Sequence, residues 1–236
     1  MSARFYVNLP LAPGPFHLDG SEAHHLATVC RLRPGAEVCL FNGDGREYPA
    51  CITQVERKQI TLEILRVEQP ERELPFTLEV GAPVPKGDRC QFLLEKLTEL
   101  GVTAFVPLLC QRSNTHPRES KREKLERYVI EASKQCGRNV LMRIDEPMEW
   151  AIYASRTHAA EMSILAHPHQ AEQLTTLAKR FKEAKVIRIA VGPEGGFADD
   201  EVALAVEHGW QTVSLGPRIL RVETAAIALA TIVCGV

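Results

Sequence analysis

The sequence lacks an apolar run long enough to cross a membrane as a helix. Its most apolar stretch, residues 225–236, follows a charged segment and is shorter than the roughly 20 residues that a membrane-spanning helix needs. The first residues, Met1 to Val7, also lack the long apolar core of a secretory signal peptide. We therefore expect no membrane association and a cytoplasmic location.

Cysteine is present in an odd number and without regular spacing. The seven cysteines are scattered between Cys30 and Cys234, and no C-x-x-C motif occurs. A disulfide framework needs pairs, and a structural zinc site needs closely spaced ligands. Reduced thiols in a cytoplasmic protein are expected, and no metal site is predicted. His24 and His25 do not change this, because adjacent helical side chains point about 100° apart.

The chain also lacks a strong excess of either charge, since its formal net charge is −2. The distribution is uneven, because residues 86–143 contain twelve Lys and Arg against seven Asp and Glu. The alternating signs in residues 118–127 are typical of a solvated, salt-bridged helix. A basic strip on one face of that helix would also supply phosphate contacts to RNA.

Residues 1–72 predict a small β domain with one helix. Short strands and glycine turns are typical of a small barrel. The expected strands cover residues 4–7, 37–42, 47–55 and 59–68, with a loop over 10–15 and a helix over 21–30. The polar, proline-bounded segment 68–75 predicts a linker to the second domain, residues 73–236.

Residues 73–236 alternate between strands and helices, which is typical of an α/β domain with a parallel sheet. The strands are expected at 76–82, 104–109, 162–166, 186–191 and 212–215, and the helices near 89–101, 119–136, 147–157, 199–209 and 225–233. Because carboxyl ends of parallel strands meet at one edge, Lys86, Arg112, His167 and Glu194 should converge there. The last helix is apolar nearly all round, so either the core or a second subunit must cover it.

Two glycine-containing loops follow the last two strands. The first is Gly192-Pro193-Glu194-Gly195-Gly196-Phe197, and the second runs from Gly216 to Thr224. Glycine lets the backbone approach a ligand closely, although ordinary βα turns also contain it. A dinucleotide site fits poorly, because the G-x-G-x-x-G spacing is missing and Gly216 stands where the ribose-binding acid is expected. A P-loop fits no better, because no G-K-[ST] follows.

The first loop, residues 192–197, and residues 215–225, which contain the second loop, closely resemble the signature of the bacterial ribosomal RNA small subunit methyltransferase E family. This SPOUT family makes N3-methyluridine in 16S rRNA, and the resemblance covers essentially the whole chain. It implies a SPOUT domain with a trefoil-knotted S-adenosylmethionine site in residues 73–236 and a PUA-like RNA-binding barrel in residues 1–72. It also implies a homodimer that acts on 16S rRNA or the small ribosomal subunit. One departure is Ala198 in place of a hydroxyl residue, and Asp199 is expected to cap the helix instead.

The resemblance also implies the site residues. The cofactor-binding set is Leu165, His167, Gly192, Pro193, Glu194, Gly195, Gly196, Leu215, Gly216, Ile219, Leu220, Val222 and Thr224. The RNA-binding set is Arg4, Arg31, Arg33, Lys86, Arg112 and Arg138. The catalytic set is Arg112 and Arg221, which would stabilise the uracil carbonyls, and Glu194, a base or an orienting group.

Structural roles compete with these assignments. Glu194 and Glu223 could cap helices, Arg221 could pair with Glu223, and Arg31 and Arg33 could favour the dipole of a helix end. The implied reaction needs N3 of uracil to lose its proton, charge on O2 and O4 to be stabilised, and N3 to align with the methyl group. It needs no metal. A SPOUT enzyme for another RNA or base atom, and a non-catalytic RNA-binding factor, remain the alternatives.

Overall fold

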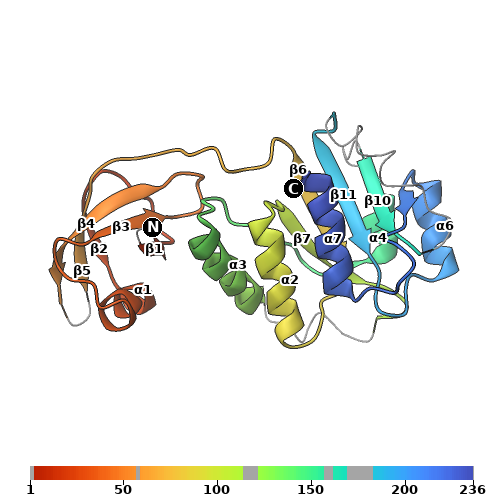
Figure 1. Cartoon of the computed structure of the whole chain (residues 1–236), viewed down its shortest axis with the longest axis horizontal. Helices are drawn as coiled ribbons and strands as arrows, with labels where there is room; N and C mark the ends of the chain where they lie inside the picture. Colours follow the sequence, from red (N-terminus) through yellow and green to blue (C-terminus); the bar gives the residue numbers. More distant parts are fainter. Residues whose placement is uncertain (1–2, 57–58, 114–121, 157–161, 169–182, 236) are drawn as a thin grey trace. The chain divides into compact units, whose positions relative to one another are not determined.

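The computed structural model describes residues 3–56, 59–113, 122–156, 162–168 and 183–235 (Figure 1). The chain forms two compact units. Unit 1 contains residues 1–73 and 133–141, and unit 2 contains residues 74–132 and 142–236. The expected boundary at residue 72 falls one residue from that of unit 1, but no sequence pattern indicated that residues 133–141 belong with it.

Unit 1 is a five-stranded mixed sheet with one helical segment. Its elements are β1 (Ala3–Tyr6), β2 (Gly14–Leu18), α1 (Gly20–His24), the π-helix η1 (His25–Val29), β3 (Glu37–Phe41), β4 (Tyr48–Val55) and β5 (Ile60–Ile64). The strand order is β1-β3-β4-β5-β2, with β1 parallel to β3 and the other pairs antiparallel. Alternate side chains such as Ile60, Leu62 and Ile64 enter the core, as the period-2 pattern predicts.

Two expectations for unit 1 need correction. The expected loop over 10–15 is wrong at its end, because β2 begins at Gly14. Pro15 is tolerated there because β2 is an edge strand, where an unpaired backbone position is available. The expected helix over 21–30 is present, but its second half winds as a π-helix in which Cys30 N–H donates to His25 O.

The segment 133–141 joins unit 1 through a network of charged and polar side chains. Glu47 accepts hydrogen bonds from Arg4 (2.9 Å), Arg72 (2.7 Å) and Asn139 (3.3 Å), and Arg4 also donates to Asn139. Burial alone would raise the pKa of Glu47, but the hydrogen bonds from these three side chains hold the pKa below its usual value. These residues are far apart in sequence, so no local pattern predicts the network.

Unit 2 is an α/β domain with a seven-stranded sheet. Its elements are β6 (Thr77–Ala82), α2 (Asp88–Glu99), β7 (Ala104–Leu109), α3 (Arg122–Cys136), β8 (Arg143–Ile144), β9 (Met148–Glu149), α4 (Trp150–Ser155), β10 (Met162–Ala166), β11 (Val186–Val191), α6 (Asp199–Glu207), β12 (Gln211–Val213) and α7 (Val222–Cys234). The order is β12-β10-β11-β6-β7-β8, with β9 also paired to β7, and every pair is parallel. The predicted parallel α/β fold is confirmed.

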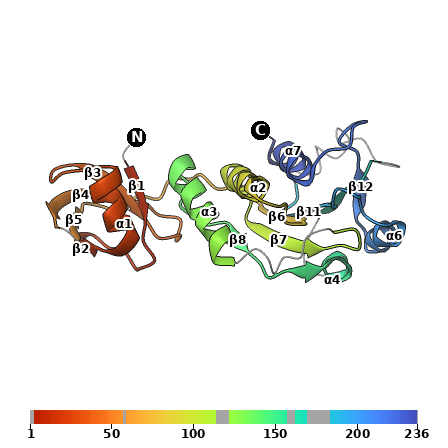
Figure 2. The ribbon, with the colours of Figure 1, turned by 90° about the horizontal axis from the view of Figure 1, so that it is seen from below.

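The sheet of unit 2 is covered on both faces. Figure 2 shows α2 and α7 on one face and α4 on the other. Burial on both sides explains why β11 is a nearly continuous apolar run, with residues 187–191 all buried. Its one charged residue, Arg188, donates to Tyr153 O and Ser163 Oγ and lies over the rings of Tyr153 and Trp210.

Several boundaries in unit 2 differ from the sequence predictions. The last helix begins at Val222 rather than residue 225, with Arg221 as its N-cap residue. The short strands β8 and β9 were not predicted, because a two-residue strand has no period to recognise. Residues 118–121 of the basic segment, the expected start of its helix at 119–121 and the expected end of the α4 helix at 157 lie outside the described residues.

Candidate active site

A pocket lies at the carboxyl ends of β10, β11 and β12, within unit 2. Its lining comes from the ends of these strands, the two glycine loops and the start of α7: Ala166, His167, Pro168, Val191, Gly192, Pro193, Glu194, Gly195, Gly196, Phe197, Leu215, Gly216, Arg218, Ile219, Leu220 and Ala225. Ten of the thirteen predicted cofactor residues line it. The parallel topology therefore brings the two loops together, as strand-end geometry predicts.

The first glycine loop is a tight turn whose glycines have different roles. Gly196 N–H donates to Pro193 O at 2.8 Å, which closes the turn. A Cβ on Gly192 would lie 2.9 Å from the ring of Phe197, so this glycine is required by packing. Gly196 has φ of 70° and Gly216 has φ of 107°, and a Cβ on either would meet no heavy atom within 4 Å. Packing does not explain these two glycines, whose backbone borders open space in the pocket.

Arg112 holds this loop from the end of β7, which is separated from β11 by β6 in the sheet. It follows β7, and its Nη1 donates to Gly195 O at 3.0 Å and to Phe197 O at 3.3 Å. A Cβ on Gly195 would lie 3.3 Å from Arg112 Cβ, so glycine also admits the arginine stem. We expected Arg112 to donate to a uracil carbonyl, whereas in the structure its guanidinium donates to loop carbonyls.

Arg89 is a site residue that the sequence analysis missed. It lies in the first turn of α2, and its Nη1 is 3.3 Å from Glu194 Oε1 and 3.9 Å from Glu223 Oε2. Glu194 belongs to the first loop, and Glu223 lies in the first turn of α7, so Arg89 links both sides of the pocket. The ion pair that Glu223 forms in the structure is with Arg89, and not with Arg221 as we had considered. Arg89 follows a strand in the same way as Lys86, a signal that could have identified it.

Glu201 connects the end of β7 to the start of α6. Its side chain accepts from Gln111 N–H at 2.9 Å and from Ala198 N–H at 2.8 Å, and the residue is 5% exposed. Asp199 does not cap α6, because the N-cap residue is Ala198 and Glu201 satisfies its N–H instead. A hydroxyl at residue 198 would accept the N–H of Glu201, and Asp200 Oδ1 accepts it instead at 3.0 Å. Through Gln111, Glu201 also fixes the loop that contains Arg112.

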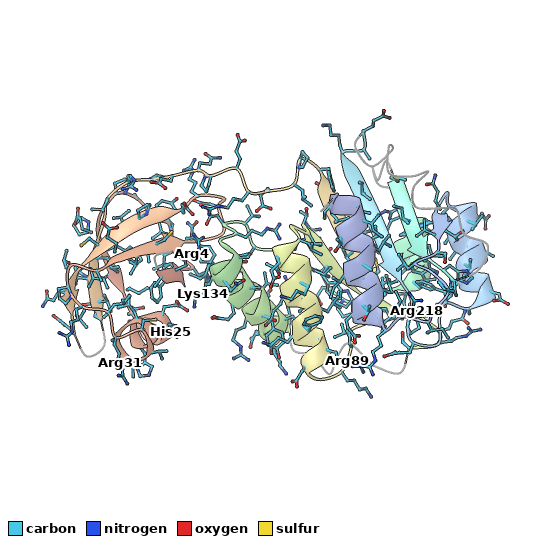
Figure 3. The ribbon with its side chains drawn as sticks, in the orientation of Figure 1. Arg4, His25, Arg31, Arg89, Lys134 and Arg218 are labelled. Atoms are coloured by element: carbon cyan, nitrogen blue, oxygen red, sulfur yellow. The ribbon has the colours of Figure 1, made fainter. Side chains whose placement is uncertain are left out.

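The other predicted residues of unit 2 lie outside the pocket lining. Leu165 and Val222 are core residues, 0% and 2% exposed. Thr224, Arg221 and Lys86 are exposed to solvent. Figure 3 labels Arg89 and Arg218, which lie on α2 and on the loop before α7. The predicted set therefore divides into a group that lines the pocket and a group that supports or borders it.

The predicted RNA-binding arginines of unit 1 divide into two buried, paired residues and two exposed ones. Arg4 has an 11% exposed side chain paired with Glu47, and Arg138 is 4% exposed and forms a bidentate pair with Glu73. Both positions are those of structural side chains. Arg31 and Arg33 are exposed, and Figure 3 shows Arg31 at the outer edge of unit 1 beyond α1. His25 packs edge-on against Phe5, which gives it a structural role.

A second, larger cavity lies in unit 1, with a volume of 360 Å³. Arg4 and Arg72 line this cavity, but their guanidinium groups are bound to Glu47, so we do not assign a ligand to the cavity. Across the residues that the structure describes, no group of three His, Cys, Asp or Glu side chains could hold a metal ion. In the same part of the chain, no helix is long and apolar enough to cross a membrane.

Two family models match the chain, one for each part. The model described as an RNA methyltransferase domain matches residues 72–234. The model described as an RNA methyltransferase PUA domain matches residues 18–65. The segment with the pocket and the segment with the mixed sheet therefore each resemble a known domain.

Similar proteins and structures extend this match over the whole chain. A ribosomal RNA small subunit methyltransferase E from Synechocystis sp. is 33% identical over 91% of this chain and 71% of its own length. The protein of that name from Mycobacterium tuberculosis is 32% identical over 97% of this chain and 90% of its own length. A crystal structure of the Neisseria gonorrhoeae protein of that name, bound to S-adenosyl methionine, superposes with a TM-score of 0.90 at 30% identity, covering 98% of this chain and 96% of that one. A putative methyltransferase from Legionella pneumophila in complex with the cofactor gives 0.87 at 29% identity, covering 100% and 98%. The chain therefore belongs to the ribosomal RNA small subunit methyltransferase E family.

Proposed function

We propose that this protein is an S-adenosylmethionine-dependent methyltransferase that methylates N3 of a uridine in 16S rRNA. The observation that carries the proposal is a pocket that both glycine loops line together at the carboxyl ends of parallel strands. The pocket lies in the segment that matches the RNA methyltransferase domain, and the Neisseria relative was crystallised with S-adenosyl methionine.

The residues of the pocket fit this cofactor. Leu215, Ile219 and Leu220 offer apolar surface to an adenine ring, and the bare backbone at Gly196 and Gly216 leaves room beside it. Such a mainly apolar pocket with few polar groups is typical of small-molecule sites. When bound, the cofactor supplies an electrophilic methyl group on its sulfonium.

The protein's own residues would orient the loops and assist loss of the N3 proton. We propose that Arg112 and Arg89 hold the first loop in place, because both contact it in the structure. Glu194 lines the pocket with a half-exposed side chain, which could accept the N3 proton or only orient the loop. Arg221, exposed immediately before α7, is our candidate for stabilising charge on a uracil carbonyl.

We also propose that unit 1 binds RNA and that unit 2 binds the cofactor and forms a homodimer. The PUA match supports the first assignment. Apolar side chains at the surface of unit 2, Ile219 at 89% and Ile232 at 38% exposure, support a second copy covering this region. A fragment of residues 73–236 would test the division, because it should keep cofactor affinity and lose most RNA affinity.

A trefoil knot and a cytoplasmic location complete the proposal. The chain passes from edge strand β12 back to α7, which packs against β6 and β11 in the middle of the sheet, the kind of return that a knot requires. All seven cysteines are free, in keeping with a reducing compartment.

The decisive experiment measures methyl transfer to small ribosomal subunits and to free 16S rRNA, both from cells that lack the enzyme. Nucleoside mass spectrometry should detect N3-methyluridine only when protein and cofactor are both added. A different methylated nucleoside would favour a SPOUT enzyme with another target. Binding of RNA without methylation or cofactor binding would favour a non-catalytic factor. The variant Arg143→Ala, whose arginine pairs with Asp145 away from the pocket, serves as an active control.

A further inference from the structure

Arg89 is shared between two carboxylates that differ in burial. Its Nη1 donates to Glu194 Oε1 at 3.3 Å, whereas Glu223 Oε2 lies 3.9 Å away, which is too far for a hydrogen bond. The Glu194 side chain lines the pocket and is 48% exposed, but that of Glu223 is only 7% exposed. Within the described residues, Glu223 Oε2 is buried and accepts no hydrogen bond. The guanidinium therefore contacts the carboxylate that needs it less.

The energies of the two contacts favour the carboxylate that Arg89 does not reach in the structure. An exposed ion pair contributes little, because water solvates both partners. A buried carboxylate without a donor is costly, because it has lost water without gaining a partner. The dipole of α7 favours a carboxylate at Glu223, but it would do so equally for an exposed one. A shift of the guanidinium by about 1 Å would bring it within hydrogen-bond distance of Glu223, so Arg89 has two accessible positions.

The backbone around these side chains does not need to move for the exchange. Arg89, which Figure 3 labels, is in the first turn of α2, and Glu223 is in the first turn of α7, which packs against α2. The packing of the two helices fixes both backbones, so a rotation of the arginine side chain is sufficient. The first glycine loop also stays anchored when Arg89 leaves Glu194, because Arg112 donates to two of its carbonyls.

We propose that Glu223 is a positioning residue that attracts Arg89 away from Glu194 and so leaves the Glu194 carboxylate free in the pocket. The inference rests on the proposed function and assigns a role in methyl transfer to a residue outside the pocket lining. With Arg89 on Glu194, the guanidinium offsets the charge of that carboxylate and occupies one of its oxygens. With Arg89 on Glu223, the buried carboxylate gains a donor, and both oxygens of Glu194 are available to the N3 proton.

The full-length variant Glu223→Gln tests this role, because glutamine keeps the size of the side chain and removes the charge that attracts Arg89. Arg89 should then remain on Glu194, so the single-turnover methylation rate at saturating cofactor should fall about 10-fold, as for one charge-assisted hydrogen bond. Calorimetry should show an unchanged cofactor Kd, since the pocket lining is intact. The matched control Glu99→Gln, which removes the carboxylate partner of Lys96 on the same helix, should change neither quantity.

Two further measurements test whether the effect passes through Arg89 and Glu194. In a Glu194→Gln background, Glu223→Gln should cause no additional loss of rate, because the carboxylate that the exchange releases is already absent. The crystal structure of Glu194→Gln should show a guanidinium nitrogen of Arg89 within about 3.2 Å of the Glu223 carboxylate, since the competing charge has been removed. This second measurement does not depend on activity.

Contrary outcomes are distinct. If the wild-type protein transfers methyl groups and Glu223→Gln does so at the same rate, Glu223 does not position Arg89 for the reaction. If the rate of Glu223→Gln falls together with its Tm and its cofactor affinity, Glu223 serves the fold and the inference is overturned. If Arg89 stays 3.9 Å from Glu223 in the Glu194→Gln structure, the exchange does not occur. If the wild-type protein transfers no methyl group, the proposed function fails and this inference fails with it.

Discussion

Replacing Arg112 by alanine should weaken cofactor binding, because this arginine holds the first glycine loop. The substitution removes hydrogen bonds to Gly195 O (3.0 Å) and Phe197 O (3.3 Å). A hydrogen bond from a charged group contributes about 1.5–3 kcal/mol. Because Arg112 is exposed and one bond is long, we take the lower end of this range, about 1.5 kcal/mol, for both bonds together, which corresponds to about a 10-fold loss of affinity.

The assay is isothermal titration calorimetry with S-adenosylmethionine, accompanied by a melting curve and a single-turnover methylation rate. Arg112→Ala should show the affinity loss with a Tm only a few degrees below that of wild type, since about 1.5 kcal/mol is lost and the core is unchanged. Arg143→Ala removes the same charge from an exposed pair with Asp145 and should bind the cofactor normally. Arg112→Lys should restore part of the affinity, because one amine can reach one carbonyl but lacks the planar fork of arginine.

One result would refute this explanation. If Arg112→Ala binds the cofactor with wild-type affinity while its methylation rate falls about 100-fold or more, Arg112 acts on the uracil carbonyl and not on the loop. Stabilising a uracil carbonyl is the role predicted for Arg112 from the sequence. The split between affinity and rate therefore decides between the two assignments.

Three further predictions follow from the structure. Gly196→Ala should lower cofactor affinity, because it adds a methyl group to a residue that lines the pocket. Melting should show a loss of only about 1 kcal/mol from the left-handed φ, since the new Cβ meets no atom within 4 Å. Unchanged affinity would place the cofactor elsewhere. If Glu194 is the base, Glu194→Gln should lower the methylation rate and remove the dependence of that rate on pH. A wild-type rate at every pH would leave Glu194 as a loop-orienting partner of Arg89. Glu47 has a lowered pKa in the folded state, so its contribution to stability is fully present above pH 4.5, its ordinary pKa, and is lost as the pH falls through its folded-state pKa. Between pH 7 and pH 3, the urea midpoint of Glu47→Gln should therefore change less than that of wild type. An equal change in the two proteins would contradict the charge network.

Much of the fold follows from local pattern. The strands at 104–109, 162–166 and 186–191 were predicted with the boundaries that the structure has, because continuous apolar runs between turn residues have a clear length. The errors occurred where local signals conflict with tertiary pairing. Gly14 and Pro15 are typical of a turn, yet the edge of the sheet in unit 1 accepts them as a strand.

The sequence by itself determined the order of most strands and helices, the two glycine loops, and the family to which they belong. Each of these depends on residues within a few positions of one another. Only the tertiary structure decided which arginines have structural roles. Arg4 pairs with Glu47 and Arg138 with Glu73, while Arg112 contacts carbonyls 83 and 85 residues away. A guanidinium can donate to a carboxylate, a backbone carbonyl or a phosphate, so its partner is set by what folding brings within reach. The left-handed backbone of Arg31 has the same origin, since it is imposed by helix-end hydrogen bonding and core packing, which the residue's own preference opposes.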